Sequence, residues 1–457
     1  MCIRDRVNEL LPGGHALGVR AVRTDATHVA RSAFDVDRLL AGAAAFAAGS
    51  LRAMPGSLVA QDVIDVEHLV AWCTSSVLVD GASVPQWADL SGVYDTIDGR
   101  HLQVHCNFPH HADGVVNHLG VPHDRDALAA AIAGRRAEDL ETELVERGMI
   151  AAFVRTPDEW SVHPHARATS TLPLLTIERI GDAPPGDAPA AGTTRVLDCS
   201  RVLAGPVAGH LLAGAGCDVL RLGAAHLPSV EVGVLSTGFG KRNADADLRT
   251  SAGRAAMDEL LAGADVWIDA YRPGSLAAAG FDAQRAAELR PGIVVVQISA
   301  FDSTADLEPG VATPWADRRG FDSIVQSTTG VRWAGGEHAV ESSGRPSDPP
   351  GSPRPRGLPV QALDHATGFL AAGVAAGLLA HQREAGGSWV ARLSLLRTRN
   401  HLVGLRAPRA YEPGAPTVPD RYWSSVDAPV GRVTAVAPFA GRWTGPPLPL
   451  GSSPPVW

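Results

Sequence analysis

Short buried strands alternate with amphipathic helices from residue 195 onward, and this alternation restricts the fold more than any other feature of the sequence. The run RVLDC predicts a buried strand, and the Ala-, Gly- and Leu-rich stretch after it predicts a helix. Repeated βαβ units of this kind predict an α/β fold with an open, Rossmann-like parallel sheet. The expected elements are strands at 195–199, 218–222, 265–271 and 293–301, and helices at 205–216, over SAGRAAMDELLAGA and over FDAQRAAELRPG.

Residues 1–180 show a less regular pattern of helices, a strand that runs into a helix, and one hairpin. In the hairpin, Leu102, Val104 and Cys106 alternate with polar residues, as in a half-buried strand. We expect a smaller α+β module at 1–180, a Pro-, Gly- and Ala-rich linker at 181–194, and a second domain at 195–457. A second such stretch, 335–359, predicts a long loop. The opening MCIRDR differs in character from the residues after it and is assigned to no element of the fold.

A weak internal repeat relates the two parts of the chain. The stretch from Phe34 to Val70 aligns with that from Leu363 to Val403, and Asp35 then occupies the place of Asp364. The alternative is a chance similarity between two Ala-rich helices. Only about 30 residues precede Asp35, whereas one βαβ unit alone needs roughly 30 or more. We therefore expect the first part, Asp35 included, to be structural, packing its helix against the second part and forming one wall of a cleft there.

Composition and charge exclude several classes of function. The formal net charge is −9, which argues against a general nucleic-acid or membrane-surface binder. The five cysteines are scattered without a C-x-x-C pair, which excludes a disulfide framework and predicts a reducing, cytoplasmic location. The first residues lack the apolar core of a signal peptide. The longest apolar run, Ala366 to Ala380, is shorter than the roughly 20 residues of a membrane span and predicts a buried helix.

Several familiar motifs are missing or weak. The sequence SRVLAGPVAG after the first strand is not G-x-G-x-x-G, and no G-x-S-x-G, P-loop or H-E-x-x-H occurs. Six histidines lie between residues 101 and 123, His110 and His111 among them, but without the spacing of metal ligands, so no metal is expected. Taken alone, GFGKR with Lys241 predicts an exposed basic turn. Asp364, which precedes an Ala- and Gly-rich helix, is either a helix cap or a reactive carboxylate at the positive end of that helix.

Four stretches in order resemble the family III acyl-CoA transferases, the CaiB/BaiF group. They are RVLDCSRVLAGPVAGHLLAGAGCDVLRL, the block from GKRNADADLRT to AYRPGSLAAAGF, the block from RPGIVVVQISAF to RRGFDSIVQSTTG, and PVQALDHATGFLAAGVAAGLLAHQREAGGSWVARLSLL. Together they span residues 194 to about 396, and the first part of the chain is similar to the smaller domain of the family, displaced to the front. The resemblance implies a fused, two-module CoA-transferase.

The resemblance also implies a covalent chemistry and a set of site residues. In the family a carboxylate attacks the thioester of an acyl-CoA, CoA returns to form an aspartyl thioester, and an acceptor acid takes over the CoA. Asp364 matches that nucleophile. The positions that line the CoA site are matched by Val202, Leu203, Ala204, Arg249, Tyr271 and Arg319. The resemblance implies a CoA thioester as substrate with no permanently bound cofactor, a carboxylic acid acceptor, and a homodimer as the usual assembly.

Some positions depart from the family pattern. Gly223 and Ala224 follow a strand where an acidic residue is common, Ala270 replaces an Asn, and Ala278 replaces a basic residue. These losses predict a weaker grip on the CoA phosphates and leave open a non-catalytic acyl-CoA-binding subunit. A third alternative, an α-methylacyl-CoA racemase, needs a His where this chain has Phe321. For the transferase we expect the SRVLAGP loop, the GFGKR turn and Asp364 to face one cleft.

Overall fold

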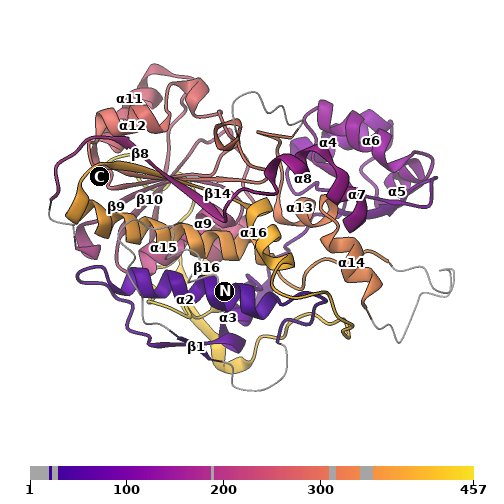
Figure 1. Cartoon of the computed structure of the whole chain (residues 1–457), viewed down its shortest axis with the longest axis horizontal. Helices are drawn as coiled ribbons and strands as arrows, with labels where there is room; N and C mark the ends of the chain where they lie inside the picture. The colour runs from indigo at the N-terminus through magenta and orange to yellow at the C-terminus, as the bar shows by residue number, and fades with distance from the viewer. Residues whose placement is uncertain (1–19, 23–28, 187–189, 308–314, 340–353) are drawn as a thin grey trace.

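The computed structural model describes residues 20–22, 29–186, 190–307, 315–339 and 354–457. Helices cover both faces of a central sheet, and a smaller group of helices and strands lies to one side (Figure 1). The initial MCIRDR and residues 340–353 of the expected long loop lie outside the described residues, as do 187–189 of the expected linker.

The central sheet has seven strands in the order β11-β10-β9-β12-β13-β14-β8, and its first six strands are parallel. Counted from β9 along the chain, those six follow the order 3-2-1-4-5-6, which is the Rossmann order. The predicted open parallel α/β sheet is confirmed, and β8 adds an antiparallel edge strand. The strands are β8 (Leu175–Gly181), β9 (Arg195–Cys199), β10 (Asp218–Gly223), β11 (Lys241–Asp245), β12 (Val266–Asp269), β13 (Val294–Ser299) and β14 (Ser388–Ser394).

Successive residues of each parallel strand face opposite layers, since side chains alternate along a strand. Val196 packs into the core under α9 (Ala204–Gly214) and α15 (Ala362–Ala385), whereas Leu197 packs with α11 (Ser251–Gly263) and α12 (Ala283–Leu289). Burial on both faces explains why these strands are continuous apolar runs. The predicted helices and strands between residues 195 and 301 are therefore confirmed, with ends shifted by a few residues.

The helix α15 lies at the centre of the larger core. It packs against α9 and the sheet on one side and against α2 (Val36–Arg52) on the other (Figure 1). At 24 residues it is long and apolar enough to cross a membrane, but 94% of its most apolar window is buried inside the protein. The prediction of a buried helix over this apolar run is confirmed.

The first part of the chain contains the predicted hairpin, formed by β5 (Gly92–Asp95) and β6 (His101–Val104) around Gly99 with φ of +67°. A third antiparallel strand, β7 (Ala151–Phe153), completes a small sheet. Its Leu102 and Val104 pack in a separate core with the adjacent helices. The helices of this side module are α4 (Pro109–Leu119), α5 (Arg125–Ala133), α6 (Ala137–Glu146), α7 (Pro157–Val162) and α8 (Pro164–Thr169).

Elements of the two parts of the sequence interleave in space. The strand β8 joins the central sheet although it precedes the predicted linker, and α2 packs on α15. Two further strands of the first part, β3 (Val77–Val79) and β4 (Ala82–Ser83), share a sheet with the C-terminal β15 (Trp423–Ala428) and β16 (Gly431–Val436). The expectation that a helix of the first part packs against the second is confirmed.

The internal repeat has a counterpart in the order of elements. After the Ala-rich helix α2 come β2 (Val63–Asp65) and α3 (Val66–Trp72), and after α15 come β14 and α16 (Leu395–Val403). In addition, β1 (Arg20–Val22) pairs in parallel with β2, as β13 does with β14. The remaining helices are α10 (Glu231–Thr237), α13 (Asp322–Thr328) and α14 (Val331–Glu337).

The prediction of an exposed basic turn at GFGKR is wrong. Lys241 begins the strand β11 and is 4% exposed, and its ammonium donates to Oδ2 of Asp198 at 2.8 Å and to the carbonyl of Pro206 at 2.7 Å. Gly209 of α9 makes room for this ion pair, because an added Cβ would lie 2.4 Å from the Asp198 carboxylate. The basic residues of this strand suggested an exposed position, but Lys241 forms a buried ion pair that links β11 to β9.

Replacing Lys241 by Met is expected to lower the free energy of unfolding by about 3–5 kcal/mol, because Asp198 would keep a buried, unpaired charge. Urea denaturation of the variant measures this loss. The double variant Lys241→Met with Asp198→Asn is expected to regain part of the stability. Equal stability of the wild type and Lys241→Met would contradict the assignment of this pair as a structural tie.

Candidate functional site

A cleft of about 1050 Å³ opens at the carboxyl ends of β9, β10, β12 and β13. Open α/β sheets bind their ligands at this edge, where the strand order changes direction. The structure brings all seven residues predicted for the site into the lining of this one cleft. They are Val202, Leu203, Ala204, Arg249, Tyr271, Arg319 and Asp364.

The loop between β9 and α9 carries a backbone distortion. Val202 has φ of +71°, a left-handed conformation that β-branched residues rarely adopt. Such a conformation costs about 1–3 kcal/mol and persists only where the surrounding packing imposes it. The carbonyl oxygen of Val202 lies against Gly233 of α10, where an added Cβ would approach it to 2.8 Å. Strain of this kind clusters at functional sites, and here it shapes a wall of the cleft.

Asp364 lies in the first turn of α15 and is 7% exposed. Its carboxylate accepts a hydrogen bond from the backbone N–H of Ala204, the first residue of α9. The N-termini of two helices therefore meet at one carboxylate, and the positive ends of both helix dipoles favour negative charge there. The structure thus places Asp364 inside the helix as a group facing the cleft, and Gln361 takes the cap position.

Asp322, at the start of α13, was not predicted as a site residue. Its Oδ2 accepts the backbone N–H groups of Leu363 at 2.8 Å and of Asp364 at 3.0 Å, and its Oδ1 accepts from the side-chain amide of Gln326. It therefore supplies the cap that the first turn of α15 lacks. The sequence did contain a signal for Asp322, because it begins a helical stretch inside a matched block. Its hydrogen-bond partner Asp364 lies 42 residues away, so no local pattern connected the two.

The two carboxylates influence each other. Burial raises the pKa of Asp364 well above its ordinary value, and the nearby charge of Asp322 raises it further. The hydrogen bond from the N–H of Ala204 lowers this pKa but does not outweigh the other two effects. Burial also raises the pKa of Asp322. Two neighbouring buried carboxylates do not both ionise easily. Asp322 accepts three hydrogen bonds and Asp364 one, so Asp364 is the group that holds a proton in the free protein.

Arginines give the outer part of the cleft its positive charge. The guanidinium of Arg201 lies 4.7 Å from the ring centre of Phe108 and donates to the carbonyl of Pro228. Arg319 donates to the carbonyl of Gly148 at 3.2 Å. The guanidinium of Arg272 forms no ion pair with any described residue. Arg201 and Arg272 were missed at the sequence level, although both lie within matched motifs.

Two other predicted site residues, Arg249 and Tyr271, contribute no free charge to the cleft. Arg249 lines the cleft, but Nη2 pairs with Oδ2 of Asp247 at 2.7 Å, so its charge is already partnered. Tyr271 is partly buried, and burial raises the pKa of its hydroxyl, which stays neutral. The departures from the family pattern also fall here, since the cleft is lined by Gly223, Ala224, Ala270 and Ala278.

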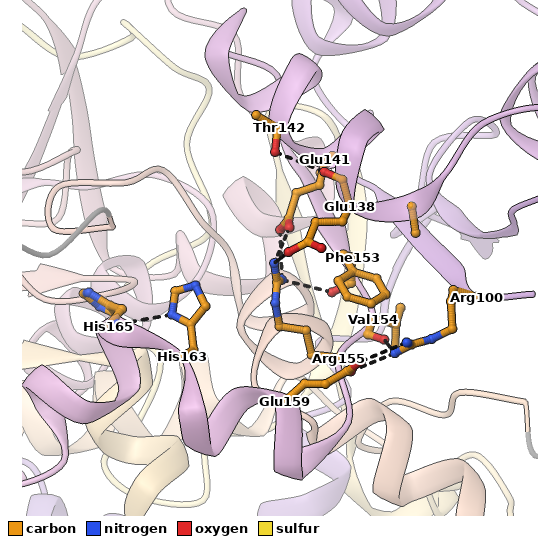
Figure 2. Close-up of polar contacts among 12 residues, drawn as sticks. Arg100, Glu138, Glu141, Thr142, Phe153, Val154, Arg155, Glu159, His163 and His165 are labelled. Carbon is orange, nitrogen blue, oxygen red and sulfur yellow. Dashed lines mark hydrogen bonds and ion pairs between the residues drawn. The ribbon is translucent and has the colours of Figure 1, made fainter. Parts of the chain in front are cut away.

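A buried ion cluster in the side module holds one edge of the cleft. Glu141 of α6 pairs with Arg155 at 2.6 Å (Figure 2) and with Arg318 at 3.0 Å. Burial alone would raise the pKa of Glu141, but the charges of Arg155 and Arg318 outweigh burial and hold it below its ordinary value. Arg318 also donates to the carbonyl of Ala151 at 3.0 Å. This cluster orders the segment that presents Arg319 to the cleft.

Two sequence expectations about the site have opposite outcomes. The SRVLAGP loop and Asp364 face the same cleft, as expected, but Lys241 and Arg242 of the GFGKR turn do not line it. Arg242 instead pairs with Asp218 at 2.8 Å on the neighbouring strand. Asp35 caps α2 through the N–H of Arg38 and does not line the cleft. Phe108, His110, His111 and Ile150 of the first part form one of its walls, as predicted.

Burial lowers the pKa of the cleft histidines His110 and His111 below the ordinary value. Burial lowers the pKa of His111 to about 3, and nearby positive groups add to the effect. Within the ranges that the structure describes, no group of three or more His, Cys, Asp or Glu side chains is placed to hold a metal ion. The four cysteines in those ranges are buried free thiols.

A second cavity of about 610 Å³ adjoins the cleft. The two share Val202, Leu203, Phe321 and Asp364 as lining residues. Asp364 therefore lies where a large, arginine-rich cleft meets a smaller cavity lined mainly by neutral groups. A carboxylate between two cavities can contact a ligand from each.

Comparison with known proteins supplies the family. Residues 192–422 match CoA-transferase family III. The chain is 26% identical over 322 residues to an acyl-CoA transferase of Gibberella moniliformis, covering 60% of this chain and 55% of that protein. It is 29% identical over 251 residues to a succinate–glutarate CoA-transferase of Agrobacterium fabrum, covering 49% and 58%. The chain thus spans somewhat more than half the length of these two relatives.

Among solved structures, a CaiB/BaiF family protein from Brucella suis is 20% identical, covering 54% of this chain and 65% of that one, with a TM-score of 0.39. The family match extends over half of the chain and includes the six parallel strands, the strained loop and Asp364. On this match, the chain belongs to CoA-transferase family III.

Proposed function

We propose that this protein transfers CoA from an acyl-CoA thioester to a carboxylic acid through a covalent intermediate on Asp364. The observation that carries the proposal is the position of Asp364 between the two cavities. The arginine-rich cleft suits the phosphates of CoA, since guanidinium groups bind phosphate oxygens in pairs. The smaller cavity suits the acyl group and the acceptor acid.

The reaction proceeds by successive attacks at the donor acyl carbon, at Cγ of Asp364 and at the acceptor acyl carbon. An oxygen of Asp364 bonds to the acyl carbon, the carbon–sulfur bond breaks, and CoA leaves as a thiolate. The thiolate then attacks Cγ of Asp364, which forms an aspartyl-CoA thioester and releases the donor acid. The acceptor carboxylate attacks the same Cγ and expels the thiolate, which finally attacks the acceptor acyl carbon and frees Asp364. Splitting the transfer in this way replaces one difficult step with easier ones.

The surroundings of Asp364 support this role. A nucleophilic carboxylate must be ionised yet poorly hydrated. The N-termini of α9 and α15 favour the ionised form, whereas burial limits hydration and raises the pKa of Asp364. Asp322 holds the backbone of the nucleophile through the N–H groups of Leu363 and Asp364. The raised pKa of Asp364 means that the reaction needs a pH high enough to remove its proton.

Two alternatives compete with transfer. A subunit that binds acyl-CoA without turnover would need only the cleft, and Ala224, Ala270 and Ala278 favoured that view at the sequence level. Arg201 and Arg272 in the same cleft offer positive charge that those alanines lack. A racemase would need an acid–base partner where Phe321 lies, and a phenyl ring carries no proton to transfer. We predict, in addition, a cytoplasmic location and assembly with a second copy of the chain.

Asp364→Ala is expected to reduce CoA transfer by about 10³-fold or more, because removal of a covalent nucleophile abolishes the main route. The readouts are transfer between a panel of acyl-CoA donors and acids, and hydroxylamine trapping of the acyl-enzyme with mass spectrometry of the Asp364 peptide. Asp35→Asn is the matched control, since Asp35 also precedes an Ala-rich helix but lines neither cavity. It should keep wild-type transfer and give the same adduct.

Retention of transfer in Asp364→Ala, with an unchanged melting temperature, would contradict the nucleophile assignment. Binding of acyl-CoA by the wild type without any trapped adduct would favour the binding subunit. An equal loss of transfer in Asp35→Asn would contradict the structural role of the first part.

The pH profile of kcat/KM tests the coupling between the two carboxylates. Since the ionised form of Asp364 is the reactive one, kcat/KM should rise with pH along a limb above the ordinary range of a carboxyl, about pH 4. Asp322→Asn removes the neighbouring negative charge, so the pKa of Asp364 falls and the limb moves to lower pH. A limb that stays in place, or moves to higher pH, would contradict the coupling, whatever happens to the maximal rate.

Single arginine variants test the CoA-binding cleft. Arg272→Ala should weaken CoA binding about tenfold, because it removes an unpartnered charge next to the phosphates. Arg249→Ala should have a smaller effect, since Asp247 already neutralises that guanidinium. Isothermal titration with CoA measures both. A larger effect for Arg249 than for Arg272 would show that CoA binding displaces Asp247.

A further inference from the structure

The smaller cavity contains a cation that the proposed transfer chemistry does not use. Arg332, near the start of α14, lines the cavity, and no other Lys or Arg does so in the described part of the chain. Asp364 is the acid of this lining and holds a proton in the free protein, whereas Arg332 is positively charged. Burial lowers the pKa of His105 to about 4 and keeps that imidazole neutral. The cavity therefore presents one reactive carboxylate and one guanidinium.

The rest of the lining is built from neutral polar and apolar side chains. The polar ones are hydroxyl and amide groups, which can accept or donate hydrogen bonds without adding charge. They come mainly from the first part of the chain, so this cavity lies between the two parts. They are Thr74, Ser75, Ser76, Gln86, Ser91, Gln103, Asn107, Ser236, Ser323 and Gln361.

A chain of hydrogen bonds orients Arg332. Its Nε donates to Oγ of Ser327 at 2.9 Å, and the hydroxyl of Ser327 donates to Oε1 of Gln103. Gln103 in turn donates to Oγ of Ser323 at 2.9 Å. Gly357 lies close by, where an added Cβ would come within 2.8 Å of Nη2 of Arg332. The side chain is thus held at Nε, and its two terminal nitrogens have no hydrogen-bond acceptor among the described residues.

The nearest acid does not neutralise Arg332 by direct contact. Asp322 and Arg332 interact through their charges, but no described carboxylate lies within 4.0 Å of the guanidinium. The oxygens of Asp322 are already taken by two backbone N–H groups and by Gln326. Burial lowers the pKa of Arg332 to about 10, which still leaves it positive at neutral pH. A partly buried guanidinium whose terminal nitrogens have no described acceptor favours a carboxylate as its partner, because the two planar groups match in shape.

We propose that Arg332 binds the second carboxylate of a dicarboxylic acid whose first carboxyl group reacts at Asp364. The proposal rests on the proposed CoA transfer and gives it a substrate class, namely dicarboxylic acids and their mono-CoA thioesters. A monocarboxylic acid in the same cavity leaves the guanidinium unpaired, and a site built to pair a polar group rejects the analogue that lacks it. Arg332 acts here as a specificity-determining residue.

The test compares acceptors of equal length with one donor, measuring kcat/KM for succinate, glutarate and adipate against butyrate, valerate and hexanoate. The wild type should prefer at least one dicarboxylate over its monocarboxylate analogue by about 100-fold or more. Arg332→Met should reduce that preference to less than about tenfold, and Arg332→Lys should restore part of it. An equal preference in wild type and Arg332→Met, or no preference in the wild type, would overturn the proposal.

A matched control separates the loss of charge recognition from general damage. Arg399 of α16 is also partly buried, and its guanidinium donates to the carbonyl of Thr329, but it lines neither cavity. Arg399→Met should lower the melting temperature without changing the ratio of dicarboxylate to monocarboxylate. A similar change of ratio in both variants would overturn the proposal.

Ligand-dependent melting gives a readout that does not need turnover. Succinate, glutarate or adipate should raise the melting temperature of the wild type more than its monocarboxylate analogue does, and the difference should vanish in Arg332→Met. If no aspartyl adduct can be trapped but this difference persists, the proposed transfer fails and the dicarboxylate site stands. If adducts form but all acids stabilise both proteins equally, the dicarboxylate site fails and transfer stands.

Discussion

The close approach of α15 to α9 is the constraint on which the site depends. Gly368 of α15 faces the carbonyl oxygen of Ala204, where an added Cβ would lie at 2.5 Å, and it also meets Val207. Any side chain at 368 would push the helices apart and remove the N–H of Ala204 from the carboxylate of Asp364. On the opposite side, Gly373 admits the ring of Phe46 from α2. Small residues thus allow α9 and α2 to pack closely against α15, the helix that carries Asp364.

This packing also explains how a carboxyl group can be accommodated in the core. An isolated charge in such a core would be costly. The charge here has the N-termini of two helices beside it, and Asp322 holds the surrounding backbone. The raised pKa of Asp364 is the remaining cost of burial, and it keeps the group protonated in the free protein.

The cleft shows how a loss at one position can be offset at another. Ala224, Ala270 and Ala278 lack the polar groups usual in the family, yet Arg201 and Arg272 line the same cleft. Lys241, which the sequence assigned to an exposed turn, instead ties β9 to β11 under the site. Some basic residues of this chain therefore form buried ion pairs that stabilise the fold, and others line the cleft, where a ligand can contact them.

The sequence by itself determined the parallel sheet, the order of its elements, and the group of residues around Asp364, because buried strands and Ala-rich helices leave local patterns and matched motifs keep their order. Only the tertiary structure decided the partners. Asp322 meets Asp364 across 42 residues, Arg318 meets Glu141 across 177, and Ser327 meets Gln103 across 224. Hydrogen bonds and ion pairs over such separations depend on how whole elements pack, which no local periodicity records.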